Sequence, residues 1–82
     1  MIHQLKIREE YYNNILNNKK KFEVRFNDRD YQVGDKIQFT KAVTNDGYEN
    51  SIFTPTKYLI VYIHTGLGLL ENYVVLGLEE IK

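Results

Sequence analysis

Apolar and polar residues alternate through most of this chain, and that period of two most constrains its fold. Such alternation is typical of β-strands, because successive side chains point to opposite faces of a sheet. The expected strands are residues 3–7, 20–27, 36–43, 58–65 and 73–81, of which 58–65 is apolar on both faces, as in a central or barrel strand, and one stretch, 8–18, has helical spacing instead. One early helix followed by strands predicts an α+β fold.

The helical stretch REEYYNNILNN gathers its apolar side chains on one stripe, formed by Tyr11, Tyr12, Ile15 and Leu16. Glu9 and Glu10 in the first turn, and lysines just past the end, complement the helix dipole. Asn18 is expected to end the helix in the left-handed conformation, which Asn tolerates better than most residues. We expect this helix to pack at one end of a small, mixed, barrel-like sheet.

The same alternation predicts which side chains form the core. In FEVRF (22–26) the three apolar residues are expected inside, with Glu23 and Arg25 facing outward or into a cleft. The predicted core comprises Phe22, Val24, Phe26, Ile37, Phe39, Ile60, Tyr62, Val74 and Leu76, with Ile15 and Leu16 against the barrel end. The Asp-Gly pair at 46–47 is a strong hairpin signal, and a barrel would remove exposed sheet edges.

Length and composition exclude several classes of protein. A chain of 82 residues is one domain, 1–82. It has no Cys, which excludes disulfides and thiolate metal sites, and it has no signal-peptide core or membrane-length apolar run, so we expect a cytoplasmic protein without a membrane partner. His3 and His64 lie on strands without an acidic cluster at ligand spacing, so we expect no metal and no cofactor. His3 is expected to be a half-buried structural histidine, and Ser51 has no positioned base.

The net charge of zero hides an asymmetry between the two halves of the chain. Residues 1–41 carry nine Lys or Arg and six Asp or Glu, whereas residues 42–82 carry two and five. A protein that coats DNA through many phosphate contacts is therefore excluded, but a local basic patch is not. That patch would centre on Lys19, Lys20, Lys21, Arg25 and Arg29.

The most informative stretch is KKKFEVRFNDRDYQVGD (19–35). Glu23 and Arg25 are two residues apart on one strand and share a face, and Lys20 lies where the chain leaves the helix. Arg offers a planar fork, Glu accepts from an exocyclic amine, and Lys supplies a point charge for a phosphate. Nearby candidate stacking surfaces for bases are Phe26, Tyr31 and Tyr48. The plainer interpretation is a solvated face with a surface salt bridge that contributes about 0–1 kcal/mol.

The segment NKKKFEVR resembles the signature of the ASCH domain family, a branch of the PUA-like superfamily. In the signature G-x-K-x-x-E-x-R the matching positions are Asn18, Lys20, Glu23 and Arg25, with Asn in place of the usual Gly. The opening HQLKI and the closing YVVLGLEEI are similar to a bacterial and phage ASCH-like subfamily. The resemblance implies a small PUA-like β-barrel, monomeric or weakly dimeric, with a cleft for RNA or a nucleotide-like ligand. Lys20, Glu23 and Arg25 would form that cleft, and Lys21, Arg29 and Tyr31 would flank it.

Two alternatives stay open. Some small ASCH proteins look like amidohydrolases that remove the acetyl group from N4-acetylcytidine, using a lysine at the position of Lys20, a threonine at that of Glu23 and a distant glutamate. Here the threonine is replaced and Glu71 is only a loose substitute for the acid. Catalysis would therefore need Lys20 or Glu23 as the base for a bound water. The second alternative is a protein-interaction module that uses the acidic C-terminal half.

Overall fold

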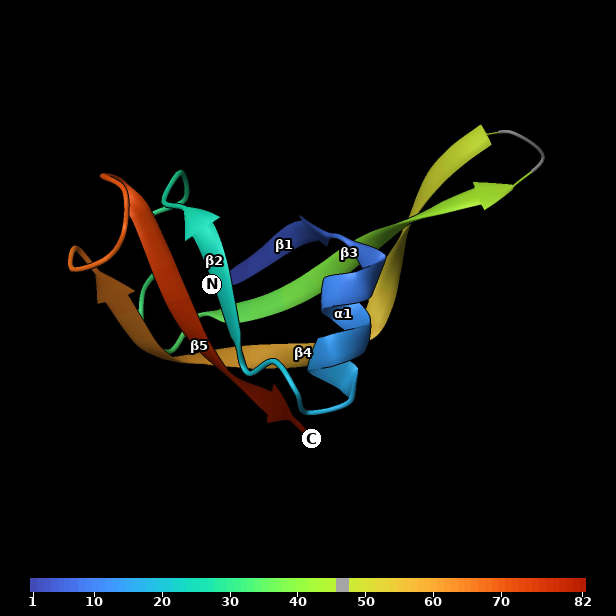
Figure 1. Ribbon diagram of the computed structural model, residues 1–82. Coiled ribbons are helices and arrows are strands. Elements are labelled where there is room, and N and C mark those ends of the chain that lie inside the picture. The colour runs from blue at the N-terminus through green and yellow to red at the C-terminus, as the bar shows by residue number, and fades with distance from the viewer. Residues whose placement is uncertain (46–47) are drawn as a thin grey trace.

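The structure is a computed structural model that describes the backbone of residues 1–45 and 48–82 and the side chains outside 42–51. It has one helix and five strands in a single sheet, which confirms the α+β class (Figure 1). The predicted Asp46-Gly47 turn and the ring of Tyr48 lie outside these described parts. The elements are β1 (Ile2–Ile7), α1 (Glu9–Leu16), β2 (Phe22–Phe26), β3 (Lys36–Asn45), β4 (Tyr48–Thr65) and β5 (Tyr73–Ile81).

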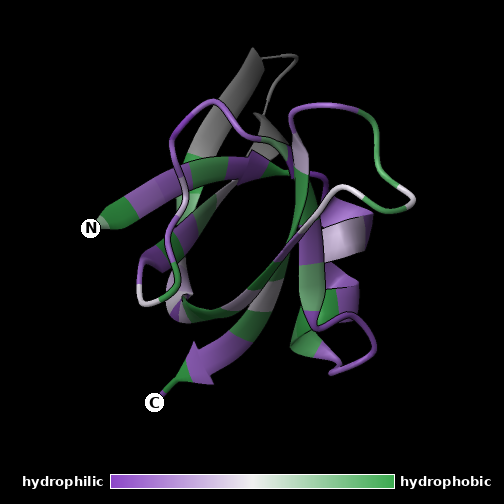
Figure 2. Cartoon of the chain, turned by 90° about the vertical axis from the view of Figure 1, so that its left-hand side faces the viewer, coloured by the Kyte–Doolittle hydropathy of each residue, from purple (hydrophilic) through white to green (hydrophobic). Residues whose placement is uncertain are grey.

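The sheet is mixed and curls into a half-barrel. Its strand order is β1-β3-β4-β5-β2, with β1 parallel to β3 and the other neighbours antiparallel. Irregularities at Gln38/Thr40 and at Ile60/Tyr62 interrupt the register of β4 with its two neighbours, and such bulges bend a sheet. The strands therefore curve around a common interior (Figure 2).

The barrel is open, which corrects the expectation that it would remove all sheet edges. In the described part of the chain, β1 and β2 stand at the two ends of the strand order and each has a neighbour on one side only. Beyond the body of the sheet, the far ends of β3 and β4 extend together as an arm (Figure 1).

Helix α1 packs at one end of the half-barrel, as predicted. Tyr12 and Ile15 are buried, and the Tyr12 ring meets the core residue Phe39 edge-on at 6.3 Å between centroids. Asn18 has φ 60°, which confirms the left-handed end of the helix. Leu16, expected inside, is 49% exposed, because an eight-residue helix turns only one narrow face to the barrel.

The core confirms part of the predicted list and inverts one strand. Fully buried side chains come from β1, β3, β4 and β5, and they are Leu5, Ile37, Phe39, Ile60, Val74 and Leu76. On β2, however, Phe22 is 45%, Val24 46% and Phe26 50% exposed, whereas Glu23 is buried. The predicted inward face of β2 is therefore wrong. Strand alternation separates two faces, but it does not say which face is inside when the inner face can pair its charges.

Tyr62 is also exposed rather than buried. The register of β4 against β5 shifts between Ile60 and Tyr62, so one extra residue lies between two paired positions. A bulge of this kind changes the parity of the strand. Ile60 therefore points inward and Tyr62 outward, and Ile63 is the next residue to pack against the core.

His3 is a buried structural histidine, more deeply buried than the half-buried one expected from the sequence. Its Nε2 lies 2.8 Å from Asp35 Oδ2, and its ring meets Tyr31 edge-on at 4.8 Å. The hydrogen bond from His3 holds the pKa of Asp35 below its usual value, and the backbone N–H of Gln32 acts in the same direction. This cluster fixes the loop between β2 and β3 to the start of β1.

Candidate functional site

The site begins with Glu23, a carboxylate on the inner face of β2 whose side chain is only 6% exposed. One oxygen accepts a hydrogen bond from Lys20 Nζ. The other lies 3.1 Å from Arg25 Nε and 3.0 Å from Arg25 Nη2. A carboxylate with two cations is satisfied although it is buried, which an isolated one would not be.

Chain geometry explains why these three groups meet. Glu23 and Arg25 are neighbours on one face of an extended strand. Lys20 follows the left-handed Asn18 that ends α1, and its backbone N–H still bonds to the Asn14 carbonyl. The turn therefore places the lysine over the start of β2. The structure thus brings together the predicted triad of Lys20, Glu23 and Arg25.

Arg25 also connects the two edges of the sheet. Its Nη2 donates to the backbone carbonyl of Lys6, at the end of β1. Bonds from Leu78 N–H to the Lys21 carbonyl and from Asn27 N–H to the Asn72 carbonyl show that odd-numbered residues of β2 bond to β5. Even-numbered residues therefore turn their backbone groups away from β5, toward β1. Arg25 bridges the seam that this leaves between β1 and β2.

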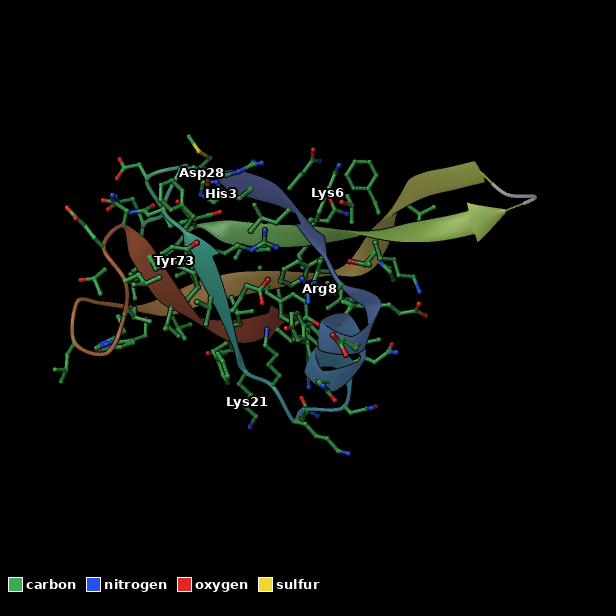
Figure 3. The ribbon with its side chains drawn as sticks, turned by 45° about the horizontal axis from the view of Figure 1, so that its top comes forward. His3, Lys6, Arg8, Lys21, Asp28 and Tyr73 are labelled. Carbon is green, nitrogen blue, oxygen red and sulfur yellow. The ribbon has the colours of Figure 1, made fainter. Side chains whose placement is uncertain are left out.

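A groove of about 520 Å³ lies over this seam. We call it the seam groove, and its lining is Lys6, Ile7, Arg8, Tyr11, Lys20, Phe22, Glu23, Val24, Arg25, Phe26 and Tyr73. The lining holds four cationic side chains and one carboxylate, so its net charge is positive in a chain whose net charge is zero. Lys6 and Arg8 lie on the β1–α1 side of β2, and Tyr73 lies on the other side (Figure 3).

Aromatic side chains stand at both ends of the seam groove. At one end Lys20 Nζ lies 4.8 Å from the centroid of the Tyr11 ring and 5.4 Å from that of Phe22. At the other end Phe26 and Tyr73 meet edge-on, with centroids 5.6 Å apart. These four residues are between 38% and 50% exposed, so part of each ring is accessible to a ligand.

The structure places the flanking candidates elsewhere. Lys21 is exposed at the start of β2 and lines a different hollow of about 600 Å³ at the barrel end. Arg29 is exposed in the loop between β2 and β3 and does not line the seam groove. Tyr31 is buried against His3, and burial raises the pKa of its hydroxyl while the charge of Arg25 acts in the opposite direction. None of these three residues lines the seam groove with the triad.

Sequence reasoning missed most of the groove's walls. The sequence pattern places Lys6 within a predicted strand, Arg8 at the start of the helical stretch, Tyr11 on the apolar stripe of that helix and Phe22 in the core. The sequence did contain a signal for Tyr11. The apolar stripe of α1 is wider than so short a helix can bury, so part of the stripe has to be exposed. No signal pointed to Tyr73, since its place beside Phe26 depends on the pairing of β2 with β5.

Among the residues that the structure describes, no group of three or more His, Asp or Glu side chains is placed to hold a metal ion. None of the described helices is long and apolar enough to cross a membrane.

Comparison with known families places the chain in one of them. It matches the family described as "Domain of unknown function (DUF3850)" over residues 2–78, and it therefore belongs to that family. A comparison with curated proteins found no match. The matched region contains every residue that lines the seam groove.

Proposed function

We propose that the seam groove binds RNA or a nucleotide. The observation that carries this proposal is the pairing of cationic with aromatic side chains along one groove. Lys6 and Arg8 supply exposed cations on one side, and the rings of Phe22 and Phe26 are exposed on the other. Grooves that bind single-stranded nucleic acid combine these same elements, since cations follow the phosphates and rings stack on bases.

Glu23 has a supporting role in this proposal. Because both of its oxygens accept from Lys20 and Arg25, it is engaged inside the protein and does not read an exocyclic amine directly. It fixes the two cations instead. Because Lys20 and Arg25 are already fixed by Glu23, they lose less conformational entropy when a ligand binds. The buried carboxylate therefore preorganises the two cations.

The same ion pairs argue for binding rather than catalysis. The amidohydrolase alternative requires Lys20 or Glu23 to take a proton from a bound water. Both groups are bonded to one another, and Glu23 is also bonded to Arg25. No observation at the groove favours the reaction over binding.

The resemblance to ASCH domains is part of the same proposal. The half-barrel, the helix at its end and the convergence of Lys20, Glu23 and Arg25 are what a PUA-like domain of that kind would have. These features support the relationship to ASCH domains. The mixed sheet positions the seam groove between its two edges.

The test is binding of a short single-stranded RNA at low salt, measured by fluorescence anisotropy. Arg8→Ala and Phe26→Ala change exposed residues of the groove. Each should weaken binding roughly 5- to 150-fold, as expected for about 1–3 kcal/mol per stacked base or desolvated contact. Lys57→Ala removes an exposed cation of β4 outside the groove and should bind as the parent does.

Raising the salt concentration distinguishes binding of nucleic acid from the remaining alternative, a protein-interaction module. Binding through phosphates should weaken steeply with salt, whereas an apolar protein contact should not. The proposal fails if the parent binds no RNA or nucleotide at low salt. It also fails if Arg8→Ala and Lys57→Ala have the same affinity.

A further inference from the structure

The seam groove has two separate aromatic ends rather than one aromatic pocket. We call them the Phe22 station and the Phe26 station. The Phe22 station holds the rings of Phe22 and Tyr11, with Lys20 Nζ near both, and the Phe26 station holds the rings of Phe26 and Tyr73. Val24 lies between them, on the same outer face of β2. The side chains that could stack on a base are therefore divided between the two ends of one strand.

The distance between the stations is larger than one base. Phe22 and Phe26 are four residues apart on an extended strand, which separates their Cα atoms by about 13 Å. Stacked bases in a nucleic-acid strand follow one another at roughly 3.4 Å. One base can therefore contact one station but not both, and the interval corresponds to several nucleotides.

Between the stations the groove presents groups that suit a strand lying along it. The backbone of Val24 faces the seam, as the pairing of β2 with β5 requires, so its N–H and C=O are available to polar atoms of a ligand. Lys6 and Arg8 lie across from β2 and are exposed, and the Arg8 guanidinium lies toward the Phe22 station, 5.7 Å from the centroid of the Tyr11 ring. Their positive charge complements a phosphate chain, which carries one negative charge per nucleotide, and does not favour a neutral or basic peptide.

We propose that the ligand of the seam groove is a single strand of several nucleotides, with one base on each station and the intervening phosphates facing Lys6 and Arg8. This inference rests on the proposed function and specifies its ligand. A mononucleotide would occupy one station only and bind weakly. An oligonucleotide would gain from both stations, because the second contact follows the first without a new loss of translational freedom.

The experiment is a length series measured by isothermal titration calorimetry. The probes are adenosine monophosphate and single-stranded adenylate dimers, tetramers and hexamers. Affinity should rise at least tenfold from the monophosphate to the hexamer and then level off. Phe22→Ala and Phe26→Ala should each weaken hexamer binding roughly 5- to 150-fold.

The monophosphate distinguishes two stations from one. Because it fills a single station, only one of the two substitutions should weaken its binding, and the other should leave it unchanged. Phe53→Ala is the matched control, since Phe53 is an exposed ring on β4 outside the groove. Phe22→Leu keeps an apolar side chain while removing the ring, and it should behave as Phe22→Ala does.

Several results would overturn the inference. If the monophosphate binds as tightly as the hexamer while Arg8→Ala still weakens both, the groove holds one nucleotide and only the proposed function stands. If no probe binds, both fail. Sedimentation should show the same mass for the parent and for Phe26→Ala. A parent dimer that this substitution dissociates would make the groove an interface between two copies.

Discussion

Glu23 shows how a buried charge can be tolerated at the edge of a small barrel. The carboxylate is nearly inaccessible, but Lys20 and Arg25 occupy both of its oxygens and are themselves 16% and 23% exposed. The cations therefore keep part of their contact with water while they neutralise the acid. An inward-pointing charge on an edge strand also discourages that edge from pairing with another chain.

Glu23→Gln should destabilise the fold. The amide keeps the shape but removes the negative charge, which leaves Lys20 and Arg25 facing one another without a counter-charge. We expect a loss of about 1–3 kcal/mol in the free energy of unfolding, measured by urea denaturation. Glu79→Gln, at an exposed position of β5, is the control and should change little. Equal midpoints for the two variants would contradict the paired arrangement.

Arg25→Lys tests the geometry rather than the charge of the site. Arginine bonds Glu23 through Nε and Nη2 and also reaches the Lys6 carbonyl, whereas a lysine is a compact point charge. The variant should lose about 1 kcal/mol of stability, seen as a lower melting temperature. Arg29→Lys, in the exposed loop, should melt as the parent does. If both variants melt alike, Arg25 does not hold the seam.

Asp35 gives the fold a dependence on acid. Its pKa is lowered chiefly by the hydrogen bond from His3, so the folded state favours the ionised carboxylate. That contribution is present above the unfolded pKa, about 3.9, and is lost as the pH falls through the folded value. Melting temperatures should therefore fall below about pH 4, and less so in Asp35→Asn. Asp28→Asn, an exposed control, should keep the parent's slope; an equal slope in Asp35→Asn would exclude this role.

At the scale of elements, β2 marks the limit of what the alternation could predict. The existence of this strand, and the shared face of Glu23 and Arg25, follow from its pattern, although the predicted stretch 20–27 is longer at both ends than the observed Phe22–Phe26. Its orientation does not, because β2 is at the edge of the sheet and its inner face meets two cations rather than a continuous apolar layer. A charged residue can face inward where side chains of opposite charge pair with it. The position of those side chains depends on the tertiary structure, which the alternation of one strand does not contain.

Two substitutions measure the orientation of β2 directly. Phe39→Ala removes a fully buried ring and should cost about 3–5 kcal/mol in the free energy of unfolding. Phe22→Ala removes a ring that is nearly half exposed and should cost roughly 1 kcal/mol or less. Chemical denaturation of the two variants decides the point. A loss at Phe22 as large as that at Phe39 would restore the inward orientation expected from the sequence.

Among the other elements, those set by local sequence were predicted well, and those set by pairing between strands were not. Strands β1, β3 and β5 and the left-handed Asn18 follow from local pattern and conformational preference. Strand β4 begins at Tyr48, ten residues before its predicted start, because its first part is stabilised by pairing with β3 in the arm. The bulge near Val61 has no local signature, so the exposure of Tyr62 could not be foreseen.

At the scale of the whole molecule, the curled sheet gathers part of the positive charge of residues 1–41 in one groove. The cations of the groove, Lys6, Arg8, Lys20 and Arg25, all come from the first third of the chain. The half-barrel brings β1, α1 and β2 together at the seam, and Glu71, Glu79 and Glu80, the acidic side chains that the structure describes in the second half, do not line the groove. The shared face of Glu23 and Arg25 was predictable from their spacing, and the resemblance to the ASCH signature added Lys20. The groove was not predictable, since it exists only where two sheet edges approach.

The central claim is that the seam groove is the surface that binds a single strand of nucleic acid. The most direct test is a titration of isotopically labelled protein with an adenylate hexamer, followed by the chemical shifts of backbone amides. We expect the largest changes at residues 6–11, at residues 20–26 and at Tyr73, and little change at loop residues 66–70. Changes confined to that loop or to the arm of β3 and β4, or no changes with saturating hexamer at low salt, would contradict it.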